Sequence, residues 1–448
     1  MALFFSADKE SRIKMECVIT QKEIYDGDGG YEIWKTNVPA KLWIKESEVE
    51  KEALDQIQNL AMLPFAFHHV AIMPDVHKGY GMPIGGVLAT EGVVVPNAVG
   101  VDIGCGMCAV KTSLKAEQLD KETIKKIFGG SEEYHGGIRS AIPVGFSHRS
   151  KKQDESLMPE FESGLPDAWE PRVYDIISQE YQSALKQLGT LGGGNHFIEI
   201  QKDEEDFVWI MIHSGSRNLG FKVANSYNKI AIDLNEKWHS SVPKKWELAF
   251  LPLDSEEGQA YLREMKYCVD FALANRQLMM SKILEIFNEQ FGELGEIEKA
   301  LDIDYKQIPT CFPINIAHNY ASMENHFGKN VMVHRKGATL ARENTIGIIP
   351  GSQGTSSYIV KGKGNKDSFM SCSHGAGRRM SRTKAENELD LQAEIKILDD
   401  QGIIHGIRNK SNLDEAAGAY KDIDKVMAHQ SDLVDIVHKL TPLAVIKG

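Results

Sequence analysis

The segment SCSHGAGRRMSR, residues 371–382, contains the residue types that best suit chemistry on a phosphate group. His374 stands among glycine, serine and alanine, and Arg378, Arg379 and Arg382 follow it. Small residues let a phosphate or a base approach the backbone closely, and arginine offers forked N–H donors that match phosphate oxygens. An imidazole in this setting is a candidate nucleophile toward phosphorus. Taken alone, the segment is equally compatible with a surface loop.

Four other segments place polar or metal-ligating residues among glycines, each next to a short apolar run. They are MPDVHKGYGMPIGG (73–86), GVDIGCGM (100–107), GTLGGGNHFIEI (189–200) and HSGSRNLG (213–220). The apolar runs 70–73, 197–200 and 208–212 predict buried strands whose ends place polar side chains in turns. Because functional groups commonly lie on loops at strand ends, these segments together favour a site in one folded unit.

A carboxylate, a thiol and three imidazoles in these surroundings are candidate ligands for a divalent metal. They are Asp102, Cys105, His196, His213 and His318. This mixture of oxygen, sulfur and nitrogen donors suits zinc, manganese or iron. A thiolate can bridge two ions, and paired metals favour phosphoryl transfer. Spacing alone does not select these five residues, because the chain has 15 histidines.

The other histidines and cysteines give weaker signals. Cys105 and Cys108 form a C-x-x-C, but no second one follows, so zinc or redox chemistry is weakly indicated. Three histidines remain ambiguous: His77, His326 and His334. The others are interpreted as having no role in the site: His68, His69, His135, His148, His239, His405, His429 and His438.

Composition limits the class of protein and its location. The chain has 448 residues, a net charge of −12 and a pI near 5.7, which argues against nonspecific coating of nucleic acid but allows a local basic cleft. The start MALFFSADKE is too short and too soon charged for a signal peptide. No apolar run is long enough to span a membrane. Six scattered cysteines predict reduced thiols in a cytoplasmic protein without membrane association.

The remaining patterns predict one compact α+β unit, a large mixed α/β domain with its site built from glycine-rich strand-end loops. Apolar spacing predicts helices over 46–62 and 421–440, and one long helix or a helix pair over 257–291. The polar stretch 148–171 reads as an insertion or a lid, with insertion favoured. Residues 443–446 predict a short buried strand near the chain end.

The ordered motifs resemble the RtcB family of tRNA-splicing and RNA-repair ligases over residues 38–448. Besides the segments above, the resemblance rests on HNYASMENHFG, RKGA, IIPGSQG, SCSHGAGRRMSRTKA, AYKDID and a C-terminal KG. It implies an RtcB-type fold for residues 38–448. Residues 1–37 match no motif and are expected to be an N-terminal extension of unknown role.

The resemblance implies a GTP-dependent ligase that joins an RNA 3′-phosphate, or a 2′,3′-cyclic phosphate after hydrolysis, to a 5′-hydroxyl. His374 would carry GMP, and Asp75 would assist near the metals. One manganese ion would be held by Cys105, His196 and His213, and the other by Asp102, Cys105 and His318. The substrate would be a spliced tRNA or another broken RNA, and the need for an archease-type activator is open.

Further roles follow from the same resemblance. Residues expected to line the GMP site are Asn195, Glu199, Ser352, Ser357, Ala376, Gly377, Tyr420 and Lys447. Residues expected to contact RNA phosphates are Arg217, Lys336, Arg378 and Arg382. A buried strand before Lys447 would fix its ammonium group, which could then donate to a guanine oxygen.

Other functions use the same residues. A guanylyltransferase that only caps 3′-phosphate ends, or a phosphodiesterase acting on cyclic phosphates, would share these steps. A noncatalytic RNA-binding protein is disfavoured because His374 and the metal ligands are present. A structural zinc protein is disfavoured because the C-x-x-C stands alone.

Overall fold

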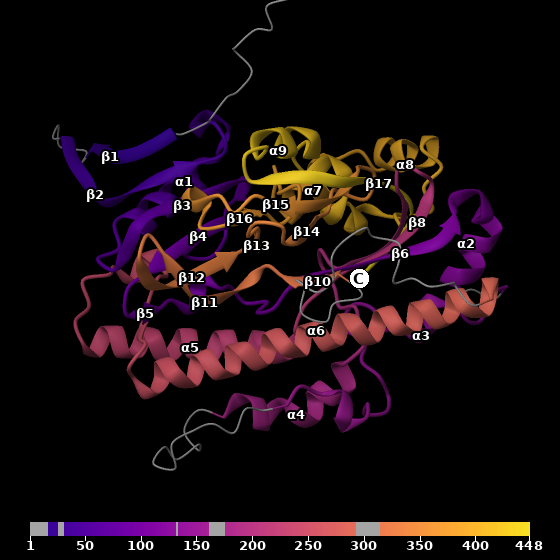
Figure 1. Ribbon diagram of the computed structural model, residues 1–448, viewed down its shortest axis with the longest axis horizontal. Coiled ribbons are helices and arrows are strands. Elements are labelled where there is room, and N and C mark those ends of the chain that lie inside the picture. Colours follow the sequence, from indigo (N-terminus) through magenta and orange to yellow (C-terminus); the bar gives the residue numbers. More distant parts are fainter. Residues whose placement is uncertain (1–16, 26–30, 131–132, 161–174, 293–313) are drawn as a thin grey trace, which may run out of the picture.

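The computed structural model describes residues 17–25, 31–130, 133–160, 175–292 and 314–448 (Figure 1). Within them, two large β-sheets form the centre of a mixed α/β domain, which confirms the expected fold class. One sheet has the order β1-β2-β3-β4-β12-β11, in which only β2 and β3 are parallel. Its strands are β1 (Cys17–Tyr25), β2 (Tyr31–Leu42), β3 (Ala66–His77), β4 (Ile84–Thr90), β12 (Lys329–Lys336) and β11 (Asn319–His326).

The second sheet is antiparallel throughout, in the order β10-β6-β8-β7-β17-β15-β14. Its strands are β10 (Ile314–Ala317), β6 (Gly106–Lys115), β8 (Phe207–Ser214), β7 (Phe197–Lys202), β17 (Val434–Lys447), β15 (Ser357–Gly362) and β14 (Ile346–Ile349). Two short ribbons pair β13 (Ala338–Leu340) with β16 (Ser371–Ser373), and β5 (Val93–Val94) with β9 (Leu251–Pro252).

In Figure 1, one group of helices runs below the two sheets and a second group lies above them. The long α6 (Glu256–Phe291) packs against β6, β8, β10 and β11, and therefore contacts both sheets. Packed beside it is α5 (Arg217–Lys237), which α4 (Ile176–Gln187) contacts in turn. The other helices are α1 (Lys51–Ala61), α2 (Lys121–Phe128), α3 (Ile138–Ala141), α7 (Arg382–Glu388), α8 (Leu391–Asp400) and α9 (Ile423–His429).

Strand β8 shows why the second sheet is buried on both faces. Ile210 and Ile212 pack into the core that includes residues of α6, while Trp209 and Met211 pack into a second core with β14 and β15. Successive side chains of a strand point to opposite faces. A strand covered on both sides therefore reads as one continuous apolar run, as predicted for 208–212.

Most elements expected from the sequence are present, with one clear error. The helices expected at 46–62 and 257–291 appear as α1 and α6, and the short strand expected at 443–446 lies within β17. The helix expected over 421–440 is wrong in its second half, because α9 ends at His429 and β17 begins at Val434. Pairing of residues 434–447 with β15 and β7, both distant in sequence, outweighs the local helical spacing.

Four further expectations concern the domain boundary, the insertion, membrane spans and the cysteines. Strand β2 crosses residues 37 and 38, between which the sequence places the start of the ligase domain; that division stays a prediction. Much of the insertion expected at 148–171 lies outside the described residues. In the described ranges, no helix has the length and apolarity needed to cross a membrane. Four cysteines in these ranges form no disulfide: Cys105, Cys108, Cys268 and Cys372.

A buried arginine joins the first sheet to the segment that carries His374. Arg335, on β12, is 0% exposed and forms an ion pair with Glu324 on β11. Its Nη2 atom donates to the Glu324 carboxylate at 3.1 Å and to the Phe369 carbonyl at 2.9 Å, and its Nε donates to Ser371 Oγ at 2.9 Å. Because one guanidinium group bonds to Glu324, Phe369 and Ser371, it fixes β16 beside the sheet.

We predict that Arg335→Ala lowers the free energy of unfolding by about 3–5 kcal/mol, because it leaves the Glu324 carboxylate buried without its main partner. Arg342→Ala is the matched control, since Arg342 lies 3.7 Å from the same carboxylate but is 54% exposed. That control should change stability by less than about 1 kcal/mol. Urea unfolding followed by circular dichroism measures both, and similar losses in the two variants would contradict the prediction.

Candidate active site and metal centre

A cavity of about 510 Å³ opens where loops of the two sheets meet. Its walls combine the His374 loop, the ends of β7 and β17, and the segments around Ser352 and Tyr420. This volume is in the range of sites for small organic ligands. Predicted residues on its walls are Asn195, Glu199, His213, Ser352, His374, Ala376, Gly377, Arg378, Arg382, Tyr420 and Lys447.

His374 is held at the cavity wall by a buried carboxylate. Asp75, near the end of β3, accepts bonds at Oδ2 from the His374 ring Nδ1 at 2.6 Å and backbone N at 3.1 Å, and from Gly375 N at 3.3 Å. Burial raises the pKa of Asp75, but the His374 ring and its hydrogen bond outweigh it and hold that pKa below its ordinary value. An Nδ1–H that donates to Asp75 leaves the lone pair of His374 on Nε2.

Two glycines allow this close packing around the histidine. Gly377 has φ +72°, and a Cβ atom there would lie 2.1 Å from the carbonyl oxygen of Asp75. Gly337 has φ +60°, and its Cβ would lie 3.0 Å from Cε1 of the His374 ring. Both positions combine a left-handed backbone with no room for a side chain. Gly377 of HGAG and Gly337 of RKGA therefore serve the geometry of the site.

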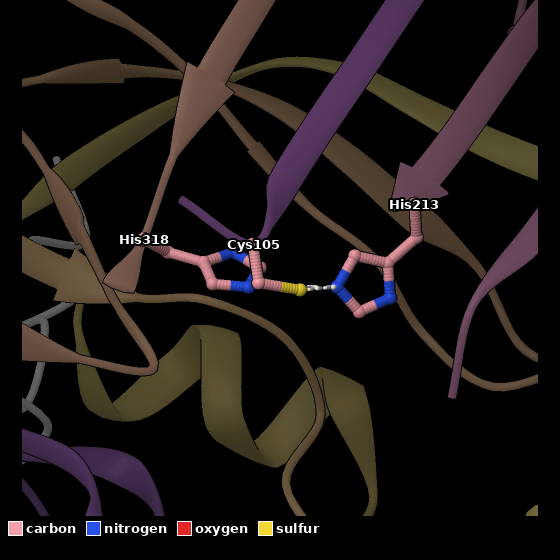
Figure 2. A group of neighbouring side chains, drawn as sticks. All are labelled: Cys105, His213 and His318. Atoms are coloured by element: carbon pink, nitrogen blue, oxygen red, sulfur yellow. Dashed lines mark hydrogen bonds between the residues drawn. The ribbon is translucent and has the colours of Figure 1, made fainter. Parts of the chain in front are cut away.

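The five predicted metal ligands converge beside the cavity. Cys105 Sγ lies 3.2 Å from His213 Nε2 and 3.5 Å from His196 Nε2. His213 Nε2 lies 3.4 Å from His318 Nε2, and His196 Nε2 lies 3.0 Å from Asp102 Oδ2. Figure 2 shows the Cys105 thiol between the rings of His213 and His318. The His318 ring also packs edge-on against His374, with 4.8 Å between ring centroids.

Backbone contacts orient two of these rings toward the centre. His196 Nδ1 lies 3.0 Å from the Leu191 carbonyl oxygen, and His213 Nδ1 lies 3.0 Å from the Asn195 carbonyl oxygen. At His213 the carbonyl takes the Nδ1 proton, which leaves the Nε2 lone pair facing Cys105 and His318. Burial, together with neighbouring histidines, lowers the pKa of His213 and of His318 well below the ordinary value.

These donors fit a divalent metal. Imidazole nitrogens, a thiol sulfur and a carboxylate oxygen face one another, and the Nε2 atoms of His213 and His318 lie 3.4 Å apart. A cation placed among them would satisfy donors that otherwise oppose each other. The compact triplets are Cys105 with His213 and His318, and Cys105 with Asp102 and His196. This division differs from the one that the resemblance implies, but Cys105 is shared in both.

The other end of the cavity has the buried groups predicted to recognise GMP. Burial raises the pKa of Glu199 to about 8, against the opposing effect of a hydrogen bond from Gln201. Gln201 also donates to Ser357 Oγ at 2.9 Å, which in turn accepts from Gly351 N at 3.2 Å. The Lys447 ammonium lies 5.5 Å from the centre of the Phe197 ring. A neutral Glu199 would have one O–H donor and one acceptor for a ligand.

The comparisons with known proteins agree with these motifs. A family model described as "tRNA-splicing ligase RtcB" matches residues 56–448. The chain belongs to the RtcB family. It is 39% identical over 426 residues to "RNA-splicing ligase RtcB" of Escherichia coli K12, covering 93% of this chain and 100% of the relative. It is 33% identical over 478 residues to "tRNA-splicing ligase RtcB" of Thermococcus kodakarensis, covering 92% and 95%.

The four predicted RNA contacts of this RtcB-family chain lie in different places. Arg378 and Arg382 line the cavity. Arg217 lies against the predicted metal ligands, with Nη1 3.3 Å from His196 Nδ1. Lys336 is buried, and its Nζ donates to carbonyl oxygens of Tyr80 and Asn97. Burial lowers the pKa of Lys336 to about 7. The structure therefore brings two of the four into the cavity, and the RNA contact of each stays a prediction.

Several cavity residues have no role in the sequence-based interpretation. They include Glu415, Phe197, Tyr80 and Glu50, together with His77, whose Nδ1 lies 3.0 Å from the Asp75 carbonyl oxygen. Glu415 comes five residues before Tyr420, in the run DEAAGAYKDID. One acidic residue among 63 carries no local signal of burial, so sequence spacing does not reveal it.

We predict that Cys105→Ala loses bound metal to a greater extent than His318→Ala, because Cys105 belongs to both triplets whereas His318 belongs to one. Cys108→Ala is the matched control, since Cys108 is buried three residues later but packs in the core with Ile198 and Ile212. The measurement is metal content by mass spectrometry after loading with MnCl2 and desalting. Control-level metal in Cys105→Ala would contradict the assignment.

Proposed function

We propose that this protein is an RNA ligase that joins 3′-phosphate or 2′,3′-cyclic phosphate ends to 5′-hydroxyl ends through GMP attached to His374. The observation that carries the proposal is the placement of His374, which Asp75 orients between a metal-ligand cluster and a nucleotide-sized cavity. Family membership supports RNA end joining, because the relatives are described as RNA-splicing and tRNA-splicing ligases.

The first chemical step is attack of His374 Nε2 on the α-phosphorus of GTP. The new N–P bond forms as the bond from the α-phosphorus to the β-phosphate oxygen breaks, and pyrophosphate leaves. Asp75 holds the Nδ1–H of the same ring, so it keeps the ring in the reactive tautomer and stabilises the positive charge that develops. The cavity wall then carries a guanylylated histidine.

The next two steps transfer GMP to RNA and seal the strand. An oxygen of the RNA 3′-phosphate attacks the phosphorus of GMP, the N–P bond breaks, and His374 is regenerated. The 5′-hydroxyl of the second RNA end then attacks the activated 3′-phosphorus, its proton is lost, and GMP leaves. A 2′,3′-cyclic end enters this sequence after water opens it to a 3′-phosphate. Positioning and charge stabilisation dominate such phosphoryl transfers.

Manganese is the expected metal, held by the Asp102, Cys105, His196, His213 and His318 cluster. When bound, two such ions would neutralise charge on the reacting phosphates and on the leaving pyrophosphate. The cluster lies beside the cavity that would hold GTP, because His213 belongs to the cluster and also lines the cavity, next to Asn195. The remaining predicted GMP contacts line or support that cavity, and Arg378 and Arg382 lie where an RNA phosphate would approach.

The proposed substrate is a tRNA cleaved during splicing or another broken RNA, acted on by residues 38–448 in the cytoplasm. An activating partner of the archease type is part of the same proposal. The decisive test is incubation with labelled GTP and MnCl2, then with a 3′-phosphate RNA and a 5′-hydroxyl RNA. Sealed product supports the ligase; accumulation of capped 3′ ends alone would indicate the guanylyltransferase.

We predict that His374→Ala abolishes both the covalent GMP label and RNA joining while the fold remains intact. The label on the unmodified protein should be acid-labile and alkali-stable, as expected of a bond between imidazole nitrogen and phosphorus. Gel electrophoresis after reaction with α-labelled GTP measures the label. His405→Ala is a control, since His405 lies outside the cavity. Labelling of His374→Ala would exclude His374 as the nucleophile.

A second prediction concerns base recognition. Lys447→Ala should raise the GTP concentration needed for labelling and reduce the preference for GTP over ATP by about tenfold, because guanine offers an oxygen acceptor where adenine has an amino donor. Manganese content should stay unchanged. Competition between labelled GTP and ATP measures the preference. An unaltered nucleotide preference would remove Lys447 from base recognition.

A further inference from the structure

Glu415 is the common partner of groups assigned to two different ligands. It ends the 3-10 helix Lys410–Glu415, and its side chain is 3% exposed on the cavity wall. Oε1 accepts from Arg378 Nη1 at 3.0 Å and Arg382 Nε at 3.0 Å. Oε2 accepts the Tyr420 hydroxyl bond and lies 3.9 Å from Lys447 Nζ. One carboxylate thus touches two predicted RNA contacts and two predicted GMP contacts.

The neighbouring cations and the Tyr420 hydroxyl keep the buried Glu415 carboxylate ionised. Burial raises the pKa of Glu415, but Lys447 and Arg378, with the Tyr420 hydrogen bond, outweigh burial and hold that pKa below its ordinary value. An ionised carboxylate at this depth is stable only when paired. Its backbone is fixed as well, because Gln353 Nε2 donates to the Glu415 carbonyl oxygen at 2.8 Å.

The two arginines on Glu415 differ in their freedom to reach another anion. Arg378 is 15% exposed and also donates to the carbonyl oxygens of Met380 and Asp414. Arg382 is 52% exposed, and within the described residues Glu415 is its one bonded partner. Arg378 is therefore anchored, while Arg382 has terminal amino groups available for a second anion.

We propose that Glu415 is a positioning residue that couples the nucleotide site to the RNA site and restrains Arg382 until an RNA phosphate competes for it. Glu415 fixes Lys447 and Tyr420 for base recognition and lowers the positive charge that the empty cavity presents. A phosphate that engages Arg382 must displace or share its bond with Glu415. This inference rests on the proposed function, because it takes GTP and an RNA phosphate as the two ligands of that cavity.

Neutralising the Glu415 carboxylate should strengthen RNA binding and weaken the preference for GTP over ATP. In Glu415→Gln the charge that restrains Arg382 is gone, so a 3′-phosphate RNA should bind about three- to tenfold more tightly at low salt. One additional phosphate contact should steepen the salt dependence of log K by about 0.7. Lys447 and Tyr420 lose their fixed partner, so the preference for GTP over ATP in labelling should fall about fivefold or more.

The experiment measures both quantities on the full chain. Fluorescence anisotropy with a labelled 3′-phosphate RNA, without nucleotide, gives affinity across a salt series, and competition between GTP and ATP gives the labelling preference. Glu394→Gln is the matched control, because Glu394 is a buried acid whose Oε2 accepts from Gly418 N at 3.3 Å and which does not line the cavity. It should change neither quantity.

A double variant tests whether the gain in RNA binding acts through Arg382. Adding Arg382→Gln to Glu415→Gln should remove the extra salt dependence, because no freed guanidinium remains. Weaker RNA binding with an unchanged slope in Glu415→Gln, or an unchanged nucleotide preference, would overturn the coupling. If unmodified protein neither takes GMP nor joins RNA, the proposed function fails; if only the variant results differ, the coupling alone fails.

Discussion

The contact between Asp75 and His374 is the interaction on which the arrangement of the site depends. Asp75 is buried near the end of β3, and one of its oxygens binds the His374 ring and two backbone N–H groups of the same loop. The contact joins residues 299 positions apart and brings the segment after β16 onto the first sheet. It also leaves the lone pair of the ring on Nε2, because Nδ1 donates to Asp75. A different partner for Nδ1 would change both the loop and the chemistry.

The second sheet places the candidate metal ligands next to that histidine. Cys105 precedes β6, His213 lies in β8, and His196 comes just before β7. Because these strands are hydrogen-bonded neighbours, ligands from distant parts of the chain meet at one end of the sheet. His318 lies between β10 and β11, and its ring contacts both His213 and His374. The candidate metal ligands and His374 are therefore parts of one packed group.

The positive charges of the cavity wall are partly balanced by a buried carboxylate. The acidic chain surrounds a local group of arginines and lysines, and Glu415 holds several of them in place. A second buried pair, Glu324 with Arg335, lies outside the cavity, and Arg335 also bonds to the segment before His374. Buried carboxylates thus set the geometry of cationic groups at both places. Removing one partner of such a pair is costly, because the other charge is then left buried and unpaired.

The sequence by itself determined the buried strands, the long helix α6 and the family, and the family resemblance, not residue spacing, selected the five candidate metal ligands that the structure brings together. Continuous apolar runs and glycine-rich turns are local signals, and the ordered motifs identify the family. Tertiary structure decided that residues 434–447 form a strand, that Lys336 is buried on backbone carbonyls, and that Glu415 joins two arginines to Tyr420 and Lys447. These features depend on partners far away in the chain. Neither hydrophobic spacing nor residue type specifies which distant group will supply a hydrogen bond, because that choice is made only when the sheets pack together.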